Sequence, residues 1–211
     1  MRWYRTAAEQ GHAGGQFSLG NRYSKGQGVA QDYGEAVRWY RKAAEQGDAM
    51  GQGGLGVMYR YGLGVAQDDG EAVRWYRKAA EQGDAEGQSN LGGMYRDGRG
   101  VAQDWGEAAR WFGKAAEQGN TVGQECLGAM YHSGRGVSQD LAEAYFWYHL
   151  AVLETVGSPD QRLTGNRDRA AAELTPEQRE AAESRATAWR LRRQEPQSAA
   201  PNAGRLGSSS P

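Results

Sequence analysis

The sequence predicts an all-α protein built as a solenoid, a stack of helix-turn-helix repeats of 36 residues. The first observation is a tryptophan that recurs every 36 residues and is followed each time by a second aromatic residue. The second is that the residues between these tryptophans keep the same order in each unit. A fixed period of this size is typical of supersecondary units that stack on their neighbours. The tryptophans are Trp3, Trp39, Trp75, Trp111 and Trp147, and the four full units are 13–48, 49–84, 85–120 and 121–156.

Residues 1–12 match only the second half of a unit, so a partial repeat with a single helix is expected there. Met1 falls at the position of Val37, Val73 and Ala109, which is an apolar helical position in the later units. This leaves open a natural start further upstream and a lost secretory signal. As it stands the chain is expected in the cytoplasm, with a periplasmic or secreted location if such a signal is missing. An open half repeat would also expose apolar surface and allow self-association.

The first half of each unit predicts a helix, named here the A helix. In the first unit this helix is expected to end at Gly26, because glycine readily adopts the left-handed conformation that follows many helices. Val29, in the short connection that follows, is expected to fill the gap between the two helices of the unit. The residues spaced i, i+3, i+4 and i+7, which form the inward stripe of this helix, are Gln16, Leu19, Gly20 and Tyr23.

The second half of each unit predicts another helix, named here the B helix. Asp32 is expected to cap its first turn, with Glu35 as the reciprocal partner of a capping box, and Gly47 follows its last turn. The unit is therefore an αα-hairpin in which small residues allow close approach and aromatic residues fill the seam. The inward face is predicted to carry Ala36, Trp39, Tyr40, Ala43 and Ala44, opposite Arg38, Arg41, Lys42 and Glu45.

Thirty-two glycines are many for a helical chain, and several fall inside the predicted helices. Each interior glycine costs roughly 0.5–1 kcal/mol relative to alanine. The sequence therefore predicts modest stability and soft first turns.

The C-terminal region, residues 157–193, is predicted to form capping helices. Residues 160–174 have the pattern of a weaker helix, interrupted at Gly165 and Asn166. Thr175 starts a second helix, because it is followed by a proline and then by a glutamine that completes a capping box. Ala182, Ala186 and Trp189 are expected to face inward on it. Residues 194–211, rich in Pro, Ser, Gly and Ala, are predicted to be disordered.

Composition argues against several classes of function. The formal net charge of −1 gives no basic excess for binding nucleic acid or anionic lipid. No stretch approaches the roughly 20 apolar residues of a membrane span, so no membrane insertion is expected. The single cysteine, Cys126, excludes an intramolecular disulfide.

The repeat A-x-G-Q-x-x-L-G-x-M-Y-x-x-G-x-G-V-x-Q-D-x-x-E-A-x-x-W-Y-x-K-A-A-E-Q-G-D, read from 49–84 and its neighbours, resembles the Sel-one-like repeat (SLR) family. The resemblance covers residues 1–156 continuously, and the C-terminal hairpin is similar to the helical ending of bacterial members. It implies a right-handed α/α superhelix related to the tetratricopeptide repeats. It also implies a non-enzymatic adaptor or scaffold for other proteins, often in signalling, secretion or envelope processes. The chain departs from the family pattern by carrying glycine where small helix formers are usual.

The residues that suggest chemistry have structural explanations in this repeat. The G-x-G segments follow a helix and recur in phase, whereas a phosphate loop follows a strand. The Asp/Glu pairs sit three residues apart at helix starts, where capping uses their carboxylates. His12, His132 and His149 have no metal-ligand spacing, and Cys126 has no adjacent histidine. No catalytic residue, metal site or cofactor is therefore expected.

Internal repetition also predicts where a protein or peptide partner would bind. Positions of the A helix that change from unit to unit form a second stripe, rotated away from the core. In related solenoids the A helices line the concave groove, so this stripe is expected to face it. Solvent positions under no constraint would vary in the same way, and that alternative stays open. The predicted partner-binding residues are the apolar anchors Phe17, Met50 and Val57 and the polar residues Asn21, Arg60, Glu86, Arg96, Glu125 and His132.

Two further alternatives remain at this point. The first is an envelope protein whose groove holds peptidoglycan or another glycan. The second is suggested by cysteine-rich secreted members of the family, which have been linked to β-lactam binding or hydrolysis. Those members carry a disulfide in each repeat, whereas this chain has one cysteine.

Overall fold

The computed structural model describes residues 2–155 and 161–194, which form eleven α-helices and contain no β-strand. Each full unit contributes one A helix and one B helix, in the order that the 36-residue period predicts. The A helices are α2 (Ala13–Lys25), α4 (Ala49–Tyr61), α6 (Ala85–Asp97) and α8 (Thr121–Ser133). The B helices are α1 (Arg2–Glu9), α3 (Tyr33–Glu45), α5 (Asp69–Glu81), α7 (Trp105–Glu117) and α9 (Leu141–Glu154), followed by α10 (Gln161–Ala172) and α11 (Pro176–Gln194).

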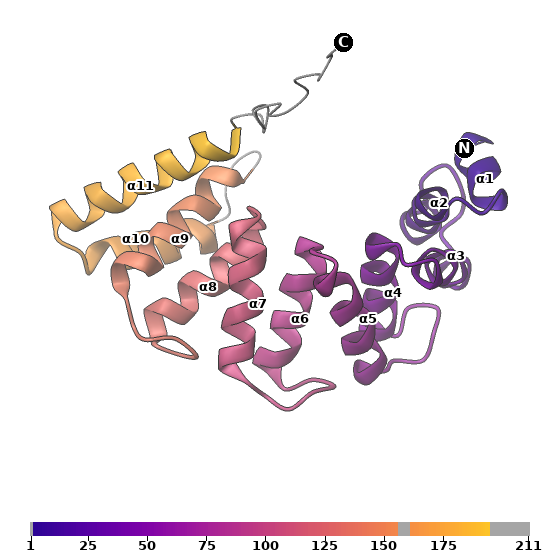
Figure 1. Cartoon of the computed structure of the whole chain (residues 1–211), viewed down its shortest axis with the longest axis horizontal. Helices are drawn as coiled ribbons and strands as arrows, with labels where there is room; N and C mark the ends of the chain where they lie inside the picture. Colours follow the sequence, from indigo (N-terminus) through magenta and orange to yellow (C-terminus); the bar gives the residue numbers. More distant parts are fainter. Residues whose placement is uncertain (1, 156–160, 195–211) are drawn as a thin grey trace, which may run out of the picture.

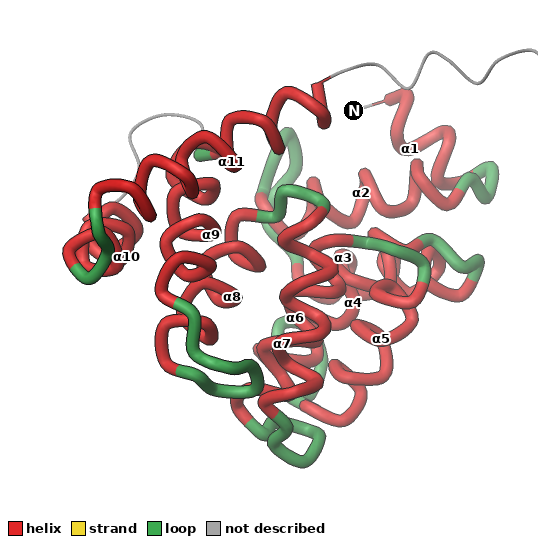
Figure 2. Tube along the Cα trace, turned by 60° about the vertical axis from the view of Figure 1, so that its left-hand side comes forward, coloured by secondary structure: helices red, strands yellow, loops and turns green. Residues whose placement is uncertain are grey.

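The helices form a curved array that opens between α1 at one end and α11 at the other (Figures 1 and 2). Consecutive A helices contact one another along the array, whereas consecutive B helices make marginal contacts at most. The A helices therefore line the inner, concave side and the B helices the outer side. Within the described residues, no helix is long and apolar enough to cross a membrane.

The helix ends follow the local signals of the sequence. Gly26 has a φ of 66° and its N–H donates to the carbonyl oxygen of Arg22, which confirms the predicted end of the first A helix. Asp32 caps the following B helix by accepting from the N–H of Glu35 at 2.9 Å. A further cap, Asp48, accepts from the N–H of Gly51 at 2.6 Å and starts the second A helix. Side-chain caps thus satisfy amide groups that the first turn of a helix leaves without partners.

The predicted capping box at the B helices is wrong in its reciprocal half. The N–H of Asp32 donates to the carbonyl oxygen of Tyr23 at 2.9 Å, in the preceding A helix. The carboxylate of Glu35 is therefore not needed there, and it accepts from the indole N–H of Trp39 at 3.2 Å and from Arg38. Glu35 thus orients the repeated tryptophan instead of closing the helix start.

The tryptophans join neighbouring repeats. Trp75 is 6% exposed and packs in one apolar cluster with Ala36 and Tyr40 of the preceding unit and with Leu55 of its own A helix. Trp39 and Trp111 occupy the equivalent places in their own clusters. Each interface between units is therefore a small core of its own, as expected for a repeat protein whose stability comes from nearest-neighbour contacts. Val29, the predicted filler of the first connection, is half-buried.

Some glycines of the repeat are sites of close approach between its segments. A Cβ atom added at Gly56 would lie 2.7 Å from the ring of Tyr76, in the B helix of the same unit. A Cβ at Gly64, which has a φ of 67°, would lie 2.3 Å from the carbonyl group of Tyr33 in the preceding unit. Gly56 lets a helix pack on a ring, so part of its helix-propensity cost is recovered in packing, and Gly64 lets a loop pack on a helix start.

Buried glutamines connect each A helix to the B helices on either side. The side-chain N–H₂ of Gln52 donates to the carbonyl oxygen of Ala44 in the preceding B helix at 3.3 Å. Its side-chain oxygen accepts from Gln82, at the end of its own B helix, at 2.7 Å. Gln16 and Gln88 make the same two bonds. These amides satisfy one another inside the stack, as buried polar groups must.

The fourth unit interrupts this pattern. Gln124 donates to the carbonyl oxygen of Ala116, but its side-chain oxygen is buried without a hydrogen-bond partner among the described residues. Glu154 occupies the position of the donor glutamine in the other units, and a carboxylate has no N–H to donate. Glu154 instead accepts from Arg190 of α11 at 3.3 Å. The terminal repeat thus exchanges an internal hydrogen bond for a contact with the following helix.

Helices α10 and α11 pack against α9 and close the array at its C-terminal end. Thr175 and Gln178 form the predicted capping box at the start of α11, and Ala182 and Ala186 are buried as expected. The predicted interruption at Gly165 and Asn166 is wrong, because α10 is continuous. The amide of Asn166 donates to Glu125 of α8, so a tertiary contact supports the helix there. The predicted disordered tail, apart from Gln194, lies outside the described residues.

Candidate partner-binding groove

A depression of about 650 Å³ lies over the first three A helices, on the concave side of the array. It is named here the N-terminal socket. Phe17 of α2, Met50 and Val57 of α4 and Glu86 of α6 line it, together with Asn21. The structure therefore brings five of the nine sequence-predicted residues into one concave surface. Met50 is a large apolar side chain, and it is 50% exposed.

The floor of the N-terminal socket is held by internal contacts. The hydroxyl group of Tyr40 donates to the side-chain oxygen of Asn21 at 2.6 Å, and its ring lies 5.9 Å from that of Phe17. Burial raises the pKa of Tyr40, so the phenol stays protonated and remains a donor. Asn21 and Phe17 are thus positioned by the core beneath them.

The rim of the socket at α6 is acidic. Asp84 caps α6 through the N–H of Gly87 at 2.6 Å, and burial raises the pKa of its carboxyl group. Glu86, in the first turn of the same helix, is exposed and forms no ion pair with a described residue. Lys25 at the end of α2 supplies the opposite charge across the socket. Because Glu86 forms no ion pair with a described residue, its carboxylate can pair with a basic group of a partner.

A second depression, of about 460 Å³, lies over α6, α8 and α10 and is named here the C-terminal socket. Arg96 and Glu125, two more of the predicted residues, line it with the exposed Val122. Arg96 is held by Asp97 at 2.7 Å, and the hydrogen bond from Arg96 lowers the pKa of that carboxyl group. Cys126 lies against Arg96 at 3.6 Å, and burial raises the pKa of its thiol. A raised pKa disfavours the thiolate, so this cysteine is a poor nucleophile.

Glu125, His132 and Arg60, like Asn21 and Arg96, make contacts within the chain. Glu125 accepts from Arg162 and Asn166 of α10, and His132 pairs with Glu173 at 2.8 Å. Arg60 is half-buried, and its guanidinium lies 5.2 Å from the ring of Tyr61. These contacts hold the side chains in place and reduce what each can offer to a partner.

The A-helix pattern missed the aromatic and loop residues that complete both sockets. Tyr33, at the start of α3, and Leu63, in the loop after α4, line the N-terminal socket. Trp105 and Arg135 hold the corresponding places in the C-terminal socket. The residues at these positions also differ from unit to unit, as they do along the variable stripe of the A helices. Variation over the whole repeat is therefore the sequence signal that indicates them.

The described residues contain no group of three or more His, Cys, Asp or Glu side chains placed to hold a metal ion. The repeated Asp and Glu side chains are engaged in capping and in ion pairs with arginine. Apolar and charged side chains together line both sockets, a composition that can contact the side chains of another protein.

Comparison with known proteins agrees with this architecture. A model of the family described as Sel1 repeat matches residues 1–12, 13–48, 49–84, 85–120 and 126–154. A comparison with curated proteins gives no match.

Solved structures resemble the chain over most of its length. A protective antigen of uropathogenic Escherichia coli with an SLR fold is 37% identical, with a TM-score of 0.80, over 97% of this chain and 45% of that one. The chain therefore spans less than half the length of that relative. A Sel1 repeat protein from Oxalobacter formigenes is 32% identical over 80% of this chain and 74% of that one, with a TM-score of 0.68. Cysteine rich protein B of Helicobacter pylori shares the fold at 23% identity and a TM-score of 0.50, over 64% of this chain and 94% of that one.

Proposed function

Because the chain belongs to the Sel1 repeat family, whose members are generally protein-interaction scaffolds, we propose that it binds a peptide segment of a partner protein along its concave groove. The observation that carries this proposal is the N-terminal socket, where the A helices α2 and α4 present Phe17, Met50 and Val57 beside Glu86 of α6, which forms no ion pair with a described residue. Peptide recognition commonly combines a pocket for an apolar anchor with charged groups on its rim.

The socket has the properties that such a site needs. Tyr40 and Asn21 fix its floor, so little conformational entropy is lost there on binding. Met50, on the rim, is exposed and unbranched, and methionine adapts its shape to different apolar partners. A role as a scaffold also agrees with the family, which is typically non-enzymatic.

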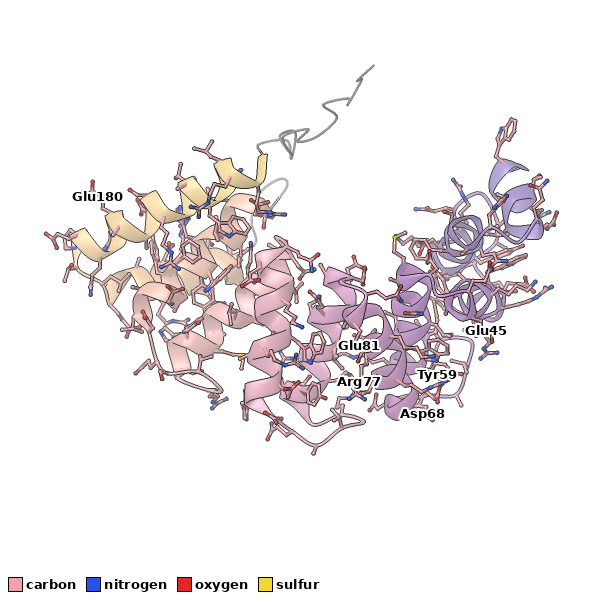
Figure 3. All side chains as sticks on the ribbon, viewed as in Figure 1. Glu45, Tyr59, Asp68, Arg77, Glu81 and Glu180 are labelled. Carbon is pink, nitrogen blue, oxygen red and sulfur yellow. The ribbon has the colours of Figure 1, made fainter. Side chains whose placement is uncertain are left out.

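The test uses a displayed library of random 12-residue peptides, selected on the immobilised full chain. Fluorescence anisotropy then gives the Kd of the enriched peptides for the unchanged chain and for two variants, Met50→Lys and Glu81→Lys. Met50→Lys is expected to weaken binding at least tenfold, because it removes an apolar contact and places a hydrated ammonium group where the apolar residue of the peptide binds. Glu81→Lys, at the end of the B helix α5 (Figure 3), is the matched control and is expected to leave the Kd unchanged.

Far-UV circular dichroism checks that both variants fold. Enriched peptides that bind Met50→Lys as tightly as the unchanged chain would overturn the groove assignment. A soluble peptidoglycan fragment that competes with these peptides would favour the glycan-binding alternative.

A further inference from the structure

The two sockets are the same structural site, repeated at an interval of two units. Eight of the ten residues that line the C-terminal socket lie in the repeats and stand 72 residues after a residue that lines the N-terminal socket, and Arg162 of α10 stands 72 residues after Asn90. Tyr33 thus corresponds to Trp105, and Met58 to Met130. The 36-residue period explains the correspondence, because equal positions in successive units adopt equal places in the stack.

The unit between the sockets uses its equivalent residues internally. Asp69 corresponds to Tyr33 and Trp105, and Arg99 corresponds to Leu63 and Arg135. Arg99 and Asp69 form a bidentate ion pair, with both N–O distances at 3.1 Å. Arg99 and Asp69 neutralise each other, so neither is free to pair with a charged residue of a partner. Charged residues of a partner can therefore pair with the groove at the two sockets but not at the site between them.

The N-terminal socket presents both charges, Glu86 on α6 and Lys25 on α2, whereas Arg135 is the one charged group of the C-terminal socket that forms no ion pair among the described residues. Glu86 gives the N-terminal socket a carboxylate that forms no ion pair with a described residue. Arg135 has the opposite role in the C-terminal socket: its guanidinium stacks on Trp105 at 5.1 Å and forms no ion pair within the described residues. An arginine that is held by an aromatic ring keeps its donors free for a carboxylate.

We propose that the two sockets together bind one extended peptide that carries an apolar residue beside a lysine or arginine, and an aspartate or glutamate further along. This inference rests on the proposed function and specifies its partner. Glu86 meets the basic residue, the apolar residue enters between Met50 and Val57, and Arg135 meets the acidic residue.

The separation of the sockets sets the spacing of these residues. Packed helices lie about 8–10 Å apart, so two steps between neighbouring A helices span roughly 18 Å. An extended chain advances about 3.3 Å per residue. Arg135 also lies past the end of α8, about 10 residues further along the repeat than the positions equivalent to Met50 and Val57, which adds an offset of roughly 15 Å along the helix direction. The two displacements combine to roughly 23 Å, so the acidic residue lies about seven residues from the apolar one.

The experiment selects the same random 12-residue library in parallel on the unchanged chain, on Arg135→Glu and on Glu86→Lys. Peptides from the unchanged chain are expected to show the basic and acidic residues at the stated spacing. Peptides selected on Arg135→Glu are expected to carry a basic residue in place of the acidic one and to keep the basic residue beside the apolar one. Peptides selected on Glu86→Lys are expected to carry an acidic residue beside the apolar one and to keep the acidic residue further along. Lys114→Glu, a charge reversal on the B helix α7, is the matched control and is expected to select the original pattern.

Affinities give the same test in quantitative form. Arg135→Glu is expected to weaken a peptide selected on the unchanged chain about tenfold, and changing the acidic residue of that peptide to lysine is expected to restore the Kd to within about twofold. Peptides that lose binding on Met50→Lys but show no charge exchange would overturn the two-socket inference and leave the proposed function standing. Peptides indifferent to Met50→Lys, or a selection without any enrichment, would overturn both.

Discussion

Two glycines on consecutive A helices, Gly56 and Gly93, are predicted to respond to alanine in opposite directions. Both are buried and helical, so helix propensity alone gives each alanine a gain of about 0.5–1 kcal/mol. A Cβ at Gly93 meets nothing within 4 Å, so that gain is kept. A Cβ at Gly56 would lie 2.7 Å from two ring carbons of Tyr76, which is fully buried and has no room to move.

Overpacking of this kind costs about 1–3 kcal/mol, so Gly56→Ala is expected to lose roughly 1–2 kcal/mol net while Gly93→Ala gains up to about 1 kcal/mol. Urea unfolding followed by circular dichroism measures both, with unchanged m-values as the check that the same surface unfolds. In a double-mutant cycle, Tyr76→Leu is expected to remove most of the cost of Gly56→Ala. Equal stability of the two alanine variants would refute the close-approach explanation of the interior glycines.

Three other predictions follow from the stack and its cap. Trp75→Ala is expected to cost about 3–5 kcal/mol in urea unfolding, because the indole is buried between two units, and a loss below 1 kcal/mol would contradict its role as a joint. Glu154→Gln is expected to raise the Tm by a few degrees, because it supplies a donor to the Gln124 oxygen that has no partner among the described residues and gives up two partly exposed ion pairs, with Arg190 and Arg193; a lower Tm would show that these ion pairs matter more. Burial lowers the pKa of His149, so the unfolded chain binds more protons just below pH 6.5 and the free energy of unfolding is expected to fall as the pH drops through 6.5. His149→Phe is expected to flatten this dependence, and an unchanged slope would contradict it.

The architecture could be predicted from the sequence because each repeat carries the local signals for its own two helices. Gly26, Asp32 and the tryptophan period are local signals that recur, and each repetition tests the same expectation again. The capping box failed at Glu35 because the N–H of Asp32 finds a carbonyl group in the preceding helix, which no local pattern shows. The continuity of α10 through Gly165 likewise depends on contacts made across the fold.

The candidate groove was predictable only in part. The varied A-helix stripe gave Phe17, Met50 and Val57, because position on a helix follows from spacing alone. It missed Tyr33 and Leu63, whose places depend on how the loop of one unit rests on the helix start of the unit before it. The stripe also could not show that α10 would engage Glu125 and that Glu173 would engage His132.

Hydrogen–deuterium exchange of the full chain, with and without a selected 12-residue peptide, tests most directly whether the concave side is the binding surface. Binding on the concave side predicts slower amide exchange in the A helices α4, α6 and α8, with the B helices α3, α5 and α7 unchanged beyond their first turns. Protection confined to the B helices, or to α11, would contradict it.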